Sequence, residues 1–427
     1  MNCIEHHCQG ESHKSTDKPC QDYAYAECSD GLSMAIVSDG HGGERYFRSQ
    51  HGSAFAVEIT KEAIRSFVAH MEEATFTPEG KKSVFEGEGL TTFSAATATD
   101  EQMDSRAHQA LKWLFASIIS QWDNRIAAHA RENDLSEWEL AHVEQKYQEE
   151  FLTKRGDPEA SFEKTYGCTL MAYVHTPDYW FAFQLGDGKC VSMRIAEDSL
   201  VCEQPIPWDE RCFLNKTTSL CDSNALEEFR YCYQGDGGSP LAVFLGSDGL
   251  DDSYGDGYNL SNFYIQLFKL IIKSGMDRAK KELVKCLPII SQKGSKDDMS
   301  VAAVFDDSNL PESFFLLTAF QKEEVSKRLN GVEDKILTLE KKIEETGDPA
   351  RLDRGRQINL EYAQKDLVKA KEEAGRLDYR LRSIKGEETK FRKSLKVDEP
   401  VPASVDPEEE TIALPEETKE PEDKCEQ

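Results

Sequence analysis

Apolar residues follow two different spacings along residues 1–305, and each spacing predicts one kind of element. Short continuous apolar runs predict buried strands at 34–37, 167–174, 179–185, 189–195, 241–245 and 299–305. Apolar residues three and four positions apart predict amphipathic helices at 53–71, 111–126, 136–154 and 263–274. Two polar stretches between these elements, 75–98 and 196–240, predict a mobile loop and a surface excursion.

Local signals refine several of these boundaries. Thr99 and Gln102 have the spacing of a capping box, which predicts a helix start. Gly275 follows the apolar helix at 263–274 and predicts its C-terminal cap. The strands at 179–185 and 189–195 are joined by a Gly-Asp-Gly turn, which predicts a β-hairpin.

The pattern beyond residue 311 is that of two long helices. Apolar residues recur by threes and fours from 325 to 343 and again from 360 to 384, with a Gly-Asp-Pro break at 347–349. This spacing predicts an antiparallel coiled-coil hairpin. The proline- and glutamate-rich stretch at 397–427 predicts a disordered tail. We therefore expect a domain at 1–310, a coiled-coil hairpin at 311–396 and an acidic tail at 397–427.

Charge limits the kinds of partner. The formal net charge is −28, and residues 397–427 contribute 12 acidic against 2 basic residues to it. This balance argues against nucleic acid or an anionic membrane as the main partner. No apolar run is long enough for a membrane span, and the N-terminal residues do not resemble a secretory signal. The twelve cysteines are then expected as reduced thiols in the cytoplasm.

One cysteine-containing group is ambiguous. Cys3, His6, His7 and Cys8 could form a zinc cluster, but no second pair follows at a recognisable spacing. We expect a short polar N-terminal segment instead.

Five carboxylates stand where predicted strands end or begin. They are Asp22, Asp39, Asp187, Asp248 and Asp297, mostly beside glycine. Strand ends of one sheet system can converge on one edge, where crowded carboxylates raise one another's pKa or bind cations. Oxygen ligands without a regular Cys or His set favour Mg²⁺ or Mn²⁺ over zinc.

These residues lie in motifs that resemble a known family. Ser38-Asp-Gly-His-Gly-Gly43, Gly167-Cys-Thr169, Gly186-Asp-Gly188, Gly246-Ser-Asp-Gly-Leu250 and Ser295-Lys-Asp-Asp-Met-Ser-Val301 follow the order found in type 2C metal-dependent protein phosphatases. The opening motifs Gly10-x-Ser-His13 and Pro19-Cys-Gln-Asp22 resemble a bacterial branch of that family. The resemblance implies an α+β fold: a four-layer α-β-β-α sandwich of two antiparallel sheets, with a metal site at one end.

The resemblance also implies a role for each motif residue. Asp39 would bridge two metal ions, and the Gly40 carbonyl would bind one of them. Asp248 and Asp297 would hold the first ion, whereas Asp22, with Gln21, would support the second through water. Asp187 would belong to a third, looser site. His41 would be the general acid that protonates the leaving group.

The sequence departs from the family pattern at two positions. The family often has glutamate where Gln21 stands, and a neutral amide weakens that metal position unless Asp22 compensates. The usual phosphate-binding arginine aligns with Asp17, so the phosphate would need another cation. His13, Lys14, Lys18 and Arg45 are the candidates, and the sequence does not choose between them.

We therefore expect hydrolysis of phosphoserine and phosphothreonine in proteins by a water molecule activated between two metal ions. A catalytically silent phosphatase-like module that docks partners through the coiled coil at 325–384 is the main alternative. Hydrolysis of a small phosphorylated molecule is a further alternative.

Overall fold

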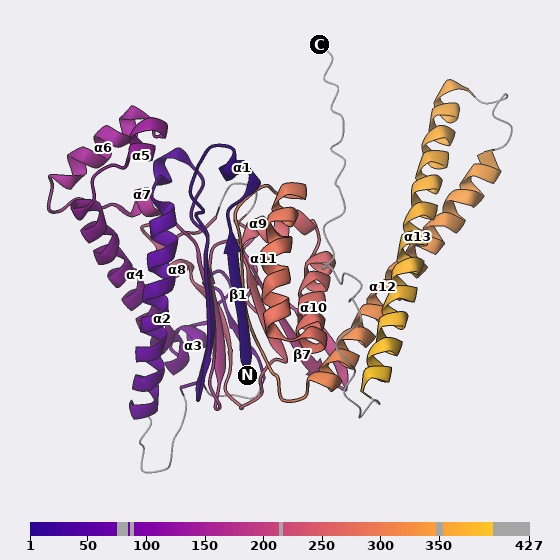
Figure 1. The fold of residues 1–427 in the computed structure, drawn as a ribbon, viewed down its shortest axis with the longest axis horizontal. Helices are drawn as coiled ribbons and strands as arrows, with labels where there is room; N and C mark the ends of the chain where they lie inside the picture. The colour runs from indigo at the N-terminus through magenta and orange to yellow at the C-terminus, as the bar shows by residue number, and fades with distance from the viewer. Residues whose placement is uncertain (75–83, 86–88, 213–216, 347–352, 396–427) are drawn as a thin grey trace, which may run out of the picture. The chain divides into compact units, whose positions relative to one another are not determined.

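The computed structural model describes residues 1–74, 84–85, 89–212, 217–346 and 353–395 (Figure 1). The chain divides into two compact units, one reaching from Met1 to Asn309 and the other containing residues from Leu310 onward, with the short segment Ala196–Leu200 assigned to the second. The predicted tail at 397–427 lies outside the described residues, as do residues 75–83 and 86–88 of the predicted loop at 75–98.

The first unit contains two antiparallel sheets. One has the strand order β2 (Tyr23–Ser29), β3 (Leu32–Ser38), β5 (Leu170–His175), β6 (Trp180–Leu185), β9 (Arg230–Gln234) and β4 (Thr91–Phe93). The other has the order β1 (Asn2–Cys8), β11 (Met299–Phe305), β10 (Ala242–Gly246), β7 (Lys189–Ala196) and β8 (Ser199–Glu203). Apolar side chains of the two inner faces meet in a shared core that includes Val37, Met171, Val243 and Val304.

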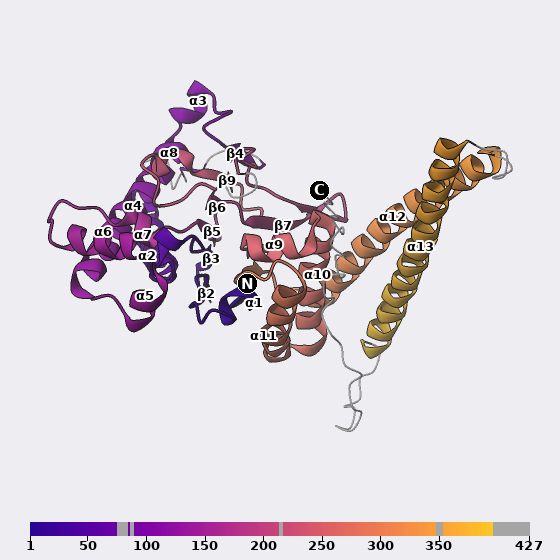
Figure 2. The ribbon, with the colours of Figure 1, turned by 90° about the horizontal axis from the view of Figure 1, so that it is seen from above.

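Helices cover the outer face of each sheet, which gives four layers (Figures 1 and 2). The long helices α2 (Ser49–Ala74) and α4 (Arg106–Glu132) pack on the six-stranded sheet, and their apolar stripes form its outer core. The five-stranded sheet is covered by α9 (Asp248–Tyr254), α10 (Gly257–Ser274) and α11 (Met276–Lys293). The predicted α-β-β-α sandwich is therefore confirmed.

Shorter helices occupy the connections. They are α1 (Glu11–Lys14), η1 (Glu44–Tyr46), α3 (Asp100–Met103), α5 (Glu137–His142), α6 (Gln145–Arg155), α7 (Glu163–Tyr166) and α8 (Ala225–Glu228). The predicted capping box at Thr99 and Gln102 is present, but it starts the short α3, and Ser105 caps the long α4. None of the described helices has an apolar stretch long enough to cross a bilayer.

Three of our predictions about strands are wrong. The N-terminal segment is strand β1, which pairs with β11 along its whole length and buries Ile4. Its seven paired residues place Cys3 and Cys8 at opposite ends of the strand, which separates the cysteines of the suggested zinc cluster. The polar stretch at 196–240 contains β9, an internal strand of the six-stranded sheet.

The third error concerns the turn at 186–188. The strands β6 and β7 on either side belong to different sheets, so they do not form a hairpin. Gly186 has a φ of +125°, a conformation that side-chain-bearing residues rarely adopt. The turn therefore carries the chain from one sheet to the other.

The second unit is built on two long helices, α12 (Leu310–Thr346) and α13 (Arg354–Ser394). Ion pairs join Lys322 to Glu388 at 2.7 Å and Lys371 to Glu340 at 2.7 Å, so the helices run antiparallel. The residues of the predicted heptad seam are buried or half-buried, among them Val325, Leu360, Ala363, Ala370 and Ile384. The coiled-coil geometry itself stays a prediction.

Candidate metal centre

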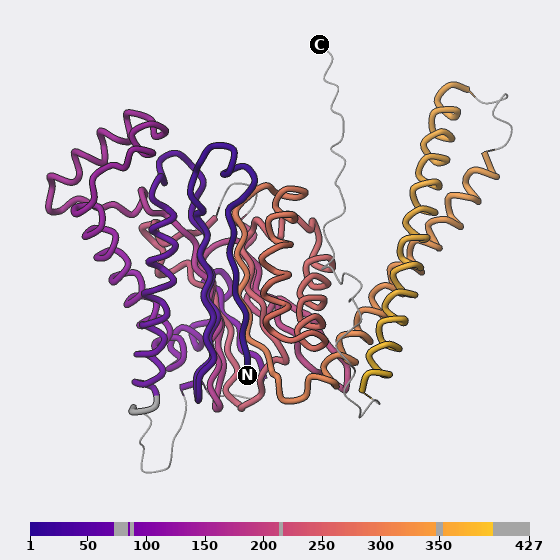
Figure 3. The backbone as a smooth tube through the Cα atoms, viewed as in Figure 1, coloured from indigo at the N-terminus to yellow at the C-terminus, as the bar shows by residue number. Residues whose placement is uncertain are grey.

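The strand register gathers the predicted carboxylates at one end of the sandwich. Tyr23 pairs with Ser38 at the edge of β2 and β3, so Asp22 and Asp39 follow directly beyond that pair. In the other sheet, Gly246 pairs with both Lys189 and Val301. Asp187, Asp248 and Asp297 thus leave the ends of three neighbouring strands. Figure 3 traces the loops at this end, where β1 leads into α1.

Asp22 is the most deeply buried of these carboxylates. The residue is 2% exposed, and among the residues that the structure describes neither of its carboxylate oxygens has a hydrogen-bond partner. Burial, and then the negative charge of Asp298, raises the pKa of Asp22 well above its ordinary value. An anionic group in this position is costly unless a cation pairs with it.

The pKa values of Asp39 and Asp248 are also raised. Burial, and then the charges of Asp22 and Asp248, raises the pKa of Asp39. Burial raises the pKa of Asp248 to about 6, with contributions from the charges of Asp187 and Asp297. Mutual repulsion of this kind shows that the structure brings Asp22, Asp39, Asp187, Asp248 and Asp297 into one electrostatic group.

Asp187 and Asp297 lie at the margins of this group. Burial, and then the nearby Asp252, raises the pKa of Asp187. Asp297 is exposed, and its Oδ1 accepts a hydrogen bond from the Asp298 backbone at 2.9 Å.

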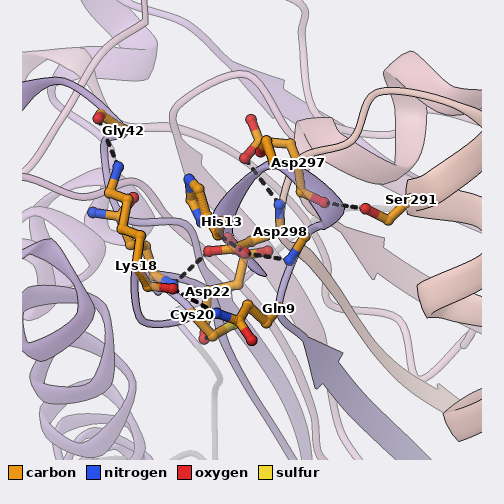
Figure 4. Close-up of polar contacts among 12 residues, drawn as sticks. Gln9, His13, Lys18, Cys20, Asp22, Gly42, Ser291, Asp297 and Asp298 are labelled. Atoms are coloured by element: carbon orange, nitrogen blue, oxygen red, sulfur yellow. Dashed lines mark hydrogen bonds and ion pairs between the residues drawn. The ribbon is translucent and has the colours of Figure 1, made fainter. Parts of the chain in front are cut away.

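Asp298 is a residue that our sequence interpretation missed. It is 3% exposed, and its Oδ1 and Oδ2 accept hydrogen bonds from the backbone N–H groups of Gly10 at 2.6 Å and Gln21 at 2.5 Å. His13 Nδ1 lies 2.9 Å from Asp298 Oδ1 (Figure 4). This carboxylate therefore holds the N-terminal loop against the start of β11. The only signal in the sequence is the second aspartate of the pair at 297–298.

The side chain of Gln21 forms hydrogen bonds that hold the loop beside the proposed metal ligands. It is 1% exposed, and its Nε2 donates to the His41 carbonyl at 3.1 Å and to the Ser49 hydroxyl. Its Oε1 is buried and has no hydrogen-bond partner in the described part of the chain. The amide oxygen is therefore one more unpaired acceptor beside Asp22.

The glycines of the motif allow the backbone to pack tightly here. Gly40 donates its N–H to the Gln21 carbonyl at 3.1 Å, and a Cβ at this position would meet that carbonyl oxygen at 2.7 Å. A Cβ at Gly249 would meet the Asp298 carbonyl oxygen at 2.1 Å. Any larger residue at either position would push the carboxylate-bearing loops apart.

The side chain of His41 lies beside the segment at 217–222. Its Nε2 is 2.7 Å from Ser219 Oγ, and its ring packs edge-on against Tyr46 at 4.8 Å between centroids. Burial lowers the pKa of His41 to about 4.

The four basic candidates differ in their surroundings. His13 is engaged with Asp298, Lys14 pairs with Glu11 at 3.4 Å, and Arg45 is exposed beside the Tyr46 ring. Lys18 is half-buried and donates to the Gly42 carbonyl at 2.7 Å (Figure 4). Burial lowers the pKa of Lys18, while the charges of Asp298, Asp297 and Asp39 oppose this shift. Lys18 therefore lies close enough to Asp39, Asp297 and Asp298 for their charges to act on it.

The donor set fits a hydrated hard cation. Within the described residues, no three carboxylate, imidazole or thiolate groups converge closely enough to hold an ion as a closed cage. Mg²⁺ commonly keeps several water molecules and takes only one or two protein carboxylates. The unpaired oxygens of Asp22 and Gln21 and the repelling pair Asp39 and Asp248 supply oxygen acceptors of that kind.

Comparison with known proteins identifies the family. The sequence profile described as Protein phosphatase 2C matches residues 9–288, a range that ends before Asp297. None of the curated proteins matches the chain.

Several solved structures are similar to this chain. The catalytic domain of the serine threonine protein phosphatase PstP in complex with two manganese ions is 13% identical, with a TM-score of 0.38, and the match covers 71% of this chain and 98% of that one. Serine/threonine phosphatase Stp1 from Staphylococcus aureus is 14% identical over 72% of this chain and 96% of its own, with a TM-score of 0.38. A C. elegans sex determining protein is 16% identical over 74% of this chain and 67% of its own, with a TM-score of 0.39.

TM-scores below 0.5 do not establish a shared fold, so the assignment rests on the profile, which spans well over half of the sequence. The chain belongs to the protein phosphatase 2C family.

Proposed function

We propose that this protein hydrolyses phosphoserine and phosphothreonine in proteins and depends on Mg²⁺ or Mn²⁺. The observation that carries this proposal is the group of buried, mutually repelling carboxylates at one end of the sandwich, in a chain of the protein phosphatase 2C family. Retaining such a group without a cation would cost stability. The alternative of a catalytically silent module gains no support from the described residues.

The proposed ligands follow from burial and charge. Asp39 and Asp248 would hold one ion, together with the Gly40 carbonyl, and Asp297 would contribute to the same ion through water. Asp22 and the Gln21 amide oxygen would support a second ion through water. Asp187 would contribute to a third, looser site. Bound Mg²⁺ or Mn²⁺ would neutralise these carboxylates and supply Lewis-acid activation of water and of the phosphate oxygens.

The remaining groups of the site would act on the substrate directly. Lys18 would bind the phosphate, because the charges of the carboxylates act on it and it is not engaged in an ion pair with one of them as His13 is. His41 would donate a proton to the departing serine or threonine oxygen, which is a poor leaving group without protonation. Asp298 would hold the loop that carries Gln21 and Asp22 in place.

Phosphate release from a phosphothreonine peptide tests the proposal. We expect turnover with Mn²⁺ or Mg²⁺, and none in the presence of a strong chelator. Asp39→Asn serves as the matched inactive control. Turnover that resists the chelator, or that only zinc restores, would contradict the proposal.

A further inference from the structure

One short segment far from the metal-binding motifs contacts the proposed general acid. Ser219 is 2% exposed, and its Oγ lies 2.7 Å from His41 Nε2. Neither the motif comparison nor the carboxylate group explains this contact. Ser219 lies in the polar stretch at 196–240, for which the sequence offered no chemical role.

The hydrogen bonds of Ser219 favour one direction for its bond to His41. A serine hydroxyl has one proton to donate. Two acceptors other than His41 lie within reach of this proton: the Cys168 carbonyl oxygen at 3.0 Å and the Cys221 Sγ at 3.1 Å. With the proton given to either of them, Ser219 Oγ has a lone pair that can accept Nε2–H of His41.

This arrangement leaves the second ring nitrogen available. Within the described part of the chain, no hydrogen bond engages His41 Nδ1. With Nε2–H bound to Ser219, Nδ1 of the neutral ring holds a lone pair. Nδ1 can therefore donate a proton to the leaving group only after it has taken one up from water and the ring has become an imidazolium.

Ser219 is itself held firmly. Its backbone N–H donates to Asp222 Oδ2 at 2.9 Å, and Asp222 Oδ1 pairs with Lys164 Nζ at 3.0 Å. The next residue, Leu220, donates its N–H to the same Cys168 carbonyl at 3.0 Å. The segment is therefore fixed to the start of β5, on the same short stretch whose Gly167 carbonyl accepts the His41 N–H at 3.0 Å.

We propose that Ser219 is a positioning residue that fixes the orientation and tautomer of His41, so that Nδ1 faces the reaction. This inference rests on the proposed phosphatase function for its consequence in catalysis, but the contact itself can be tested without turnover. A hydroxyl acceptor behind the imidazole limits ring rotation and keeps the productive nitrogen in place.

Nuclear magnetic resonance of the metal-free full chain tests the contact directly. In protein labelled with ¹⁵N-histidine, His41 is assigned by the signal lost in His41→Gln. We expect a neutral ring with its proton on Nε2 and slow exchange of that proton with water, because Ser219 binds it. Ser219→Ala should speed this exchange by at least about tenfold, and Ser219→Thr should preserve it.

Two outcomes of that spectrum overturn the inference. One is a wild-type ring protonated on Nδ1. The other is an Nε2–H exchange rate that Ser219→Ala leaves unchanged. Both are independent of phosphatase activity, so they also stand if the proposed function fails.

Kinetics then test the consequence for catalysis. Ser219→Ala should lower kcat for a phosphothreonine peptide by about tenfold, part of the 10²–10⁴-fold that general acid catalysis supplies. KM and Mn²⁺ affinity should stay within about twofold, and so should turnover of an aryl phosphate, whose leaving group needs little protonation. His41→Ala gives the full loss for comparison, and Ser219→Thr should restore peptide turnover.

Cys221→Ala is the matched control. Its buried Sγ lies 3.1 Å from Ser219 Oγ and accepts a hydrogen bond from it, and within the described residues the thiol makes no hydrogen bond to His41. The variant therefore changes the surroundings of Ser219 while the hydroxyl that contacts His41 remains. Equal losses on peptide and aryl phosphate in Ser219→Ala, or a peptide-selective loss in Cys221→Ala of the same size, would overturn the positioning role. Absence of metal-dependent turnover in the wild type would instead overturn the proposed function.

Discussion

At the scale of single residues, burial separates groups that the sequence presents as equivalent. His13, Lys14, Lys18 and Arg45 were indistinguishable as basic candidates, because the loops that carry them have no periodic pattern. The fold pairs His13 with Asp298 and places Lys18 where the charges of nearby carboxylates act on it. Asp298 itself could not be found from the sequence, because only tertiary packing makes it buried while its neighbour Asp297 stays exposed.

The buried carboxylates predict that a substitution that abolishes metal binding does not destabilise the metal-free protein. Asp39→Asn or Asp248→Asn should abolish Mn²⁺ binding and turnover together, because each removes a charge that the cation would pair with. In the metal-free protein the same changes relieve repulsion between buried carboxylates, so the melting temperature should rise or stay level. Calorimetric titration with Mn²⁺ and thermal unfolding in chelator measure the two effects. A large loss of metal-free stability in both variants would indicate structural roles instead.

Lys18 gives a second prediction at this scale. Lys18→Ala should weaken competitive inhibition by inorganic phosphate by roughly tenfold, because a cation beside the site contributes about one charge-assisted contact to phosphate. Lys14→Ala is the control, since Lys14 is an exposed lysine at the end of the nearby helix α1 and pairs with Glu11. Equal phosphate inhibition in wild type and Lys18→Ala would exclude Lys18 as the phosphate ligand.

At the scale of elements, strands with a clear apolar pattern were predicted from the sequence, and strands without one were missed. β3, β10 and β11 were predicted to within a few residues because their runs are continuously apolar and buried. β1 and β9 were missed because each mixes polar, aromatic and cysteine residues and becomes a strand only by pairing with neighbours. The path of the chain between β6 and β7 was missed because a Gly-Asp-Gly turn can close a hairpin or cross between sheets.

A buried ion pair links two elements near the site and gives a prediction about pH. Arg48, just before α2, donates from Nε to Glu139 of α5 at 2.6 Å, and both residues are less than 5% exposed. Burial alone would raise the pKa of Glu139, but hydrogen bonds from Arg48 and Ser136 outweigh it and lower the pKa below its ordinary value of 4.5. A lowered carboxyl pKa contributes stability above the ordinary value and loses it as the pH falls through the folded-state pKa.

The free energy of unfolding should therefore decrease as the pH falls below 4.5, and less steeply in Glu139→Gln than in the wild type. At pH 7 the variant should be less stable by about 3–5 kcal/mol, since Arg48 is left as a buried charge without its partner. Urea unfolding at several pH values measures both effects. Glu137→Gln, an exposed neighbour on the same helix, should change neither. Wild-type stability at pH 7 in Glu139→Gln would show that the pair is not coupled to folding.

At the scale of the whole molecule, the two compact units suggest separate roles. The five predicted metal-site aspartates all lie before Asn309, and the antiparallel helices α12 and α13 supply none of them. The heptad spacing predicted these helices well, because a repeated apolar stripe is the clearest long-range pattern in a sequence. What they bind could not be predicted, since the same stripe is used for packing the helices against each other.

We therefore expect a chain ending at Asn309 to keep metal-dependent hydrolysis of a small aryl phosphate while losing a partner or a protein substrate. The reason is that the proposed ligands, Lys18 and His41 all belong to the first unit, whose sheets and covering helices form their own cores. Turnover of the aryl phosphate and of a phosphoprotein should be compared in the full and shortened chains, with circular dichroism and thermal unfolding to establish that the shortened chain is folded. Equal turnover of both substrates would mean that the hairpin is a spacer without a role in substrate choice. Loss of aryl phosphate hydrolysis in a folded shortened chain would place the hairpin within the active architecture and contradict this division of roles.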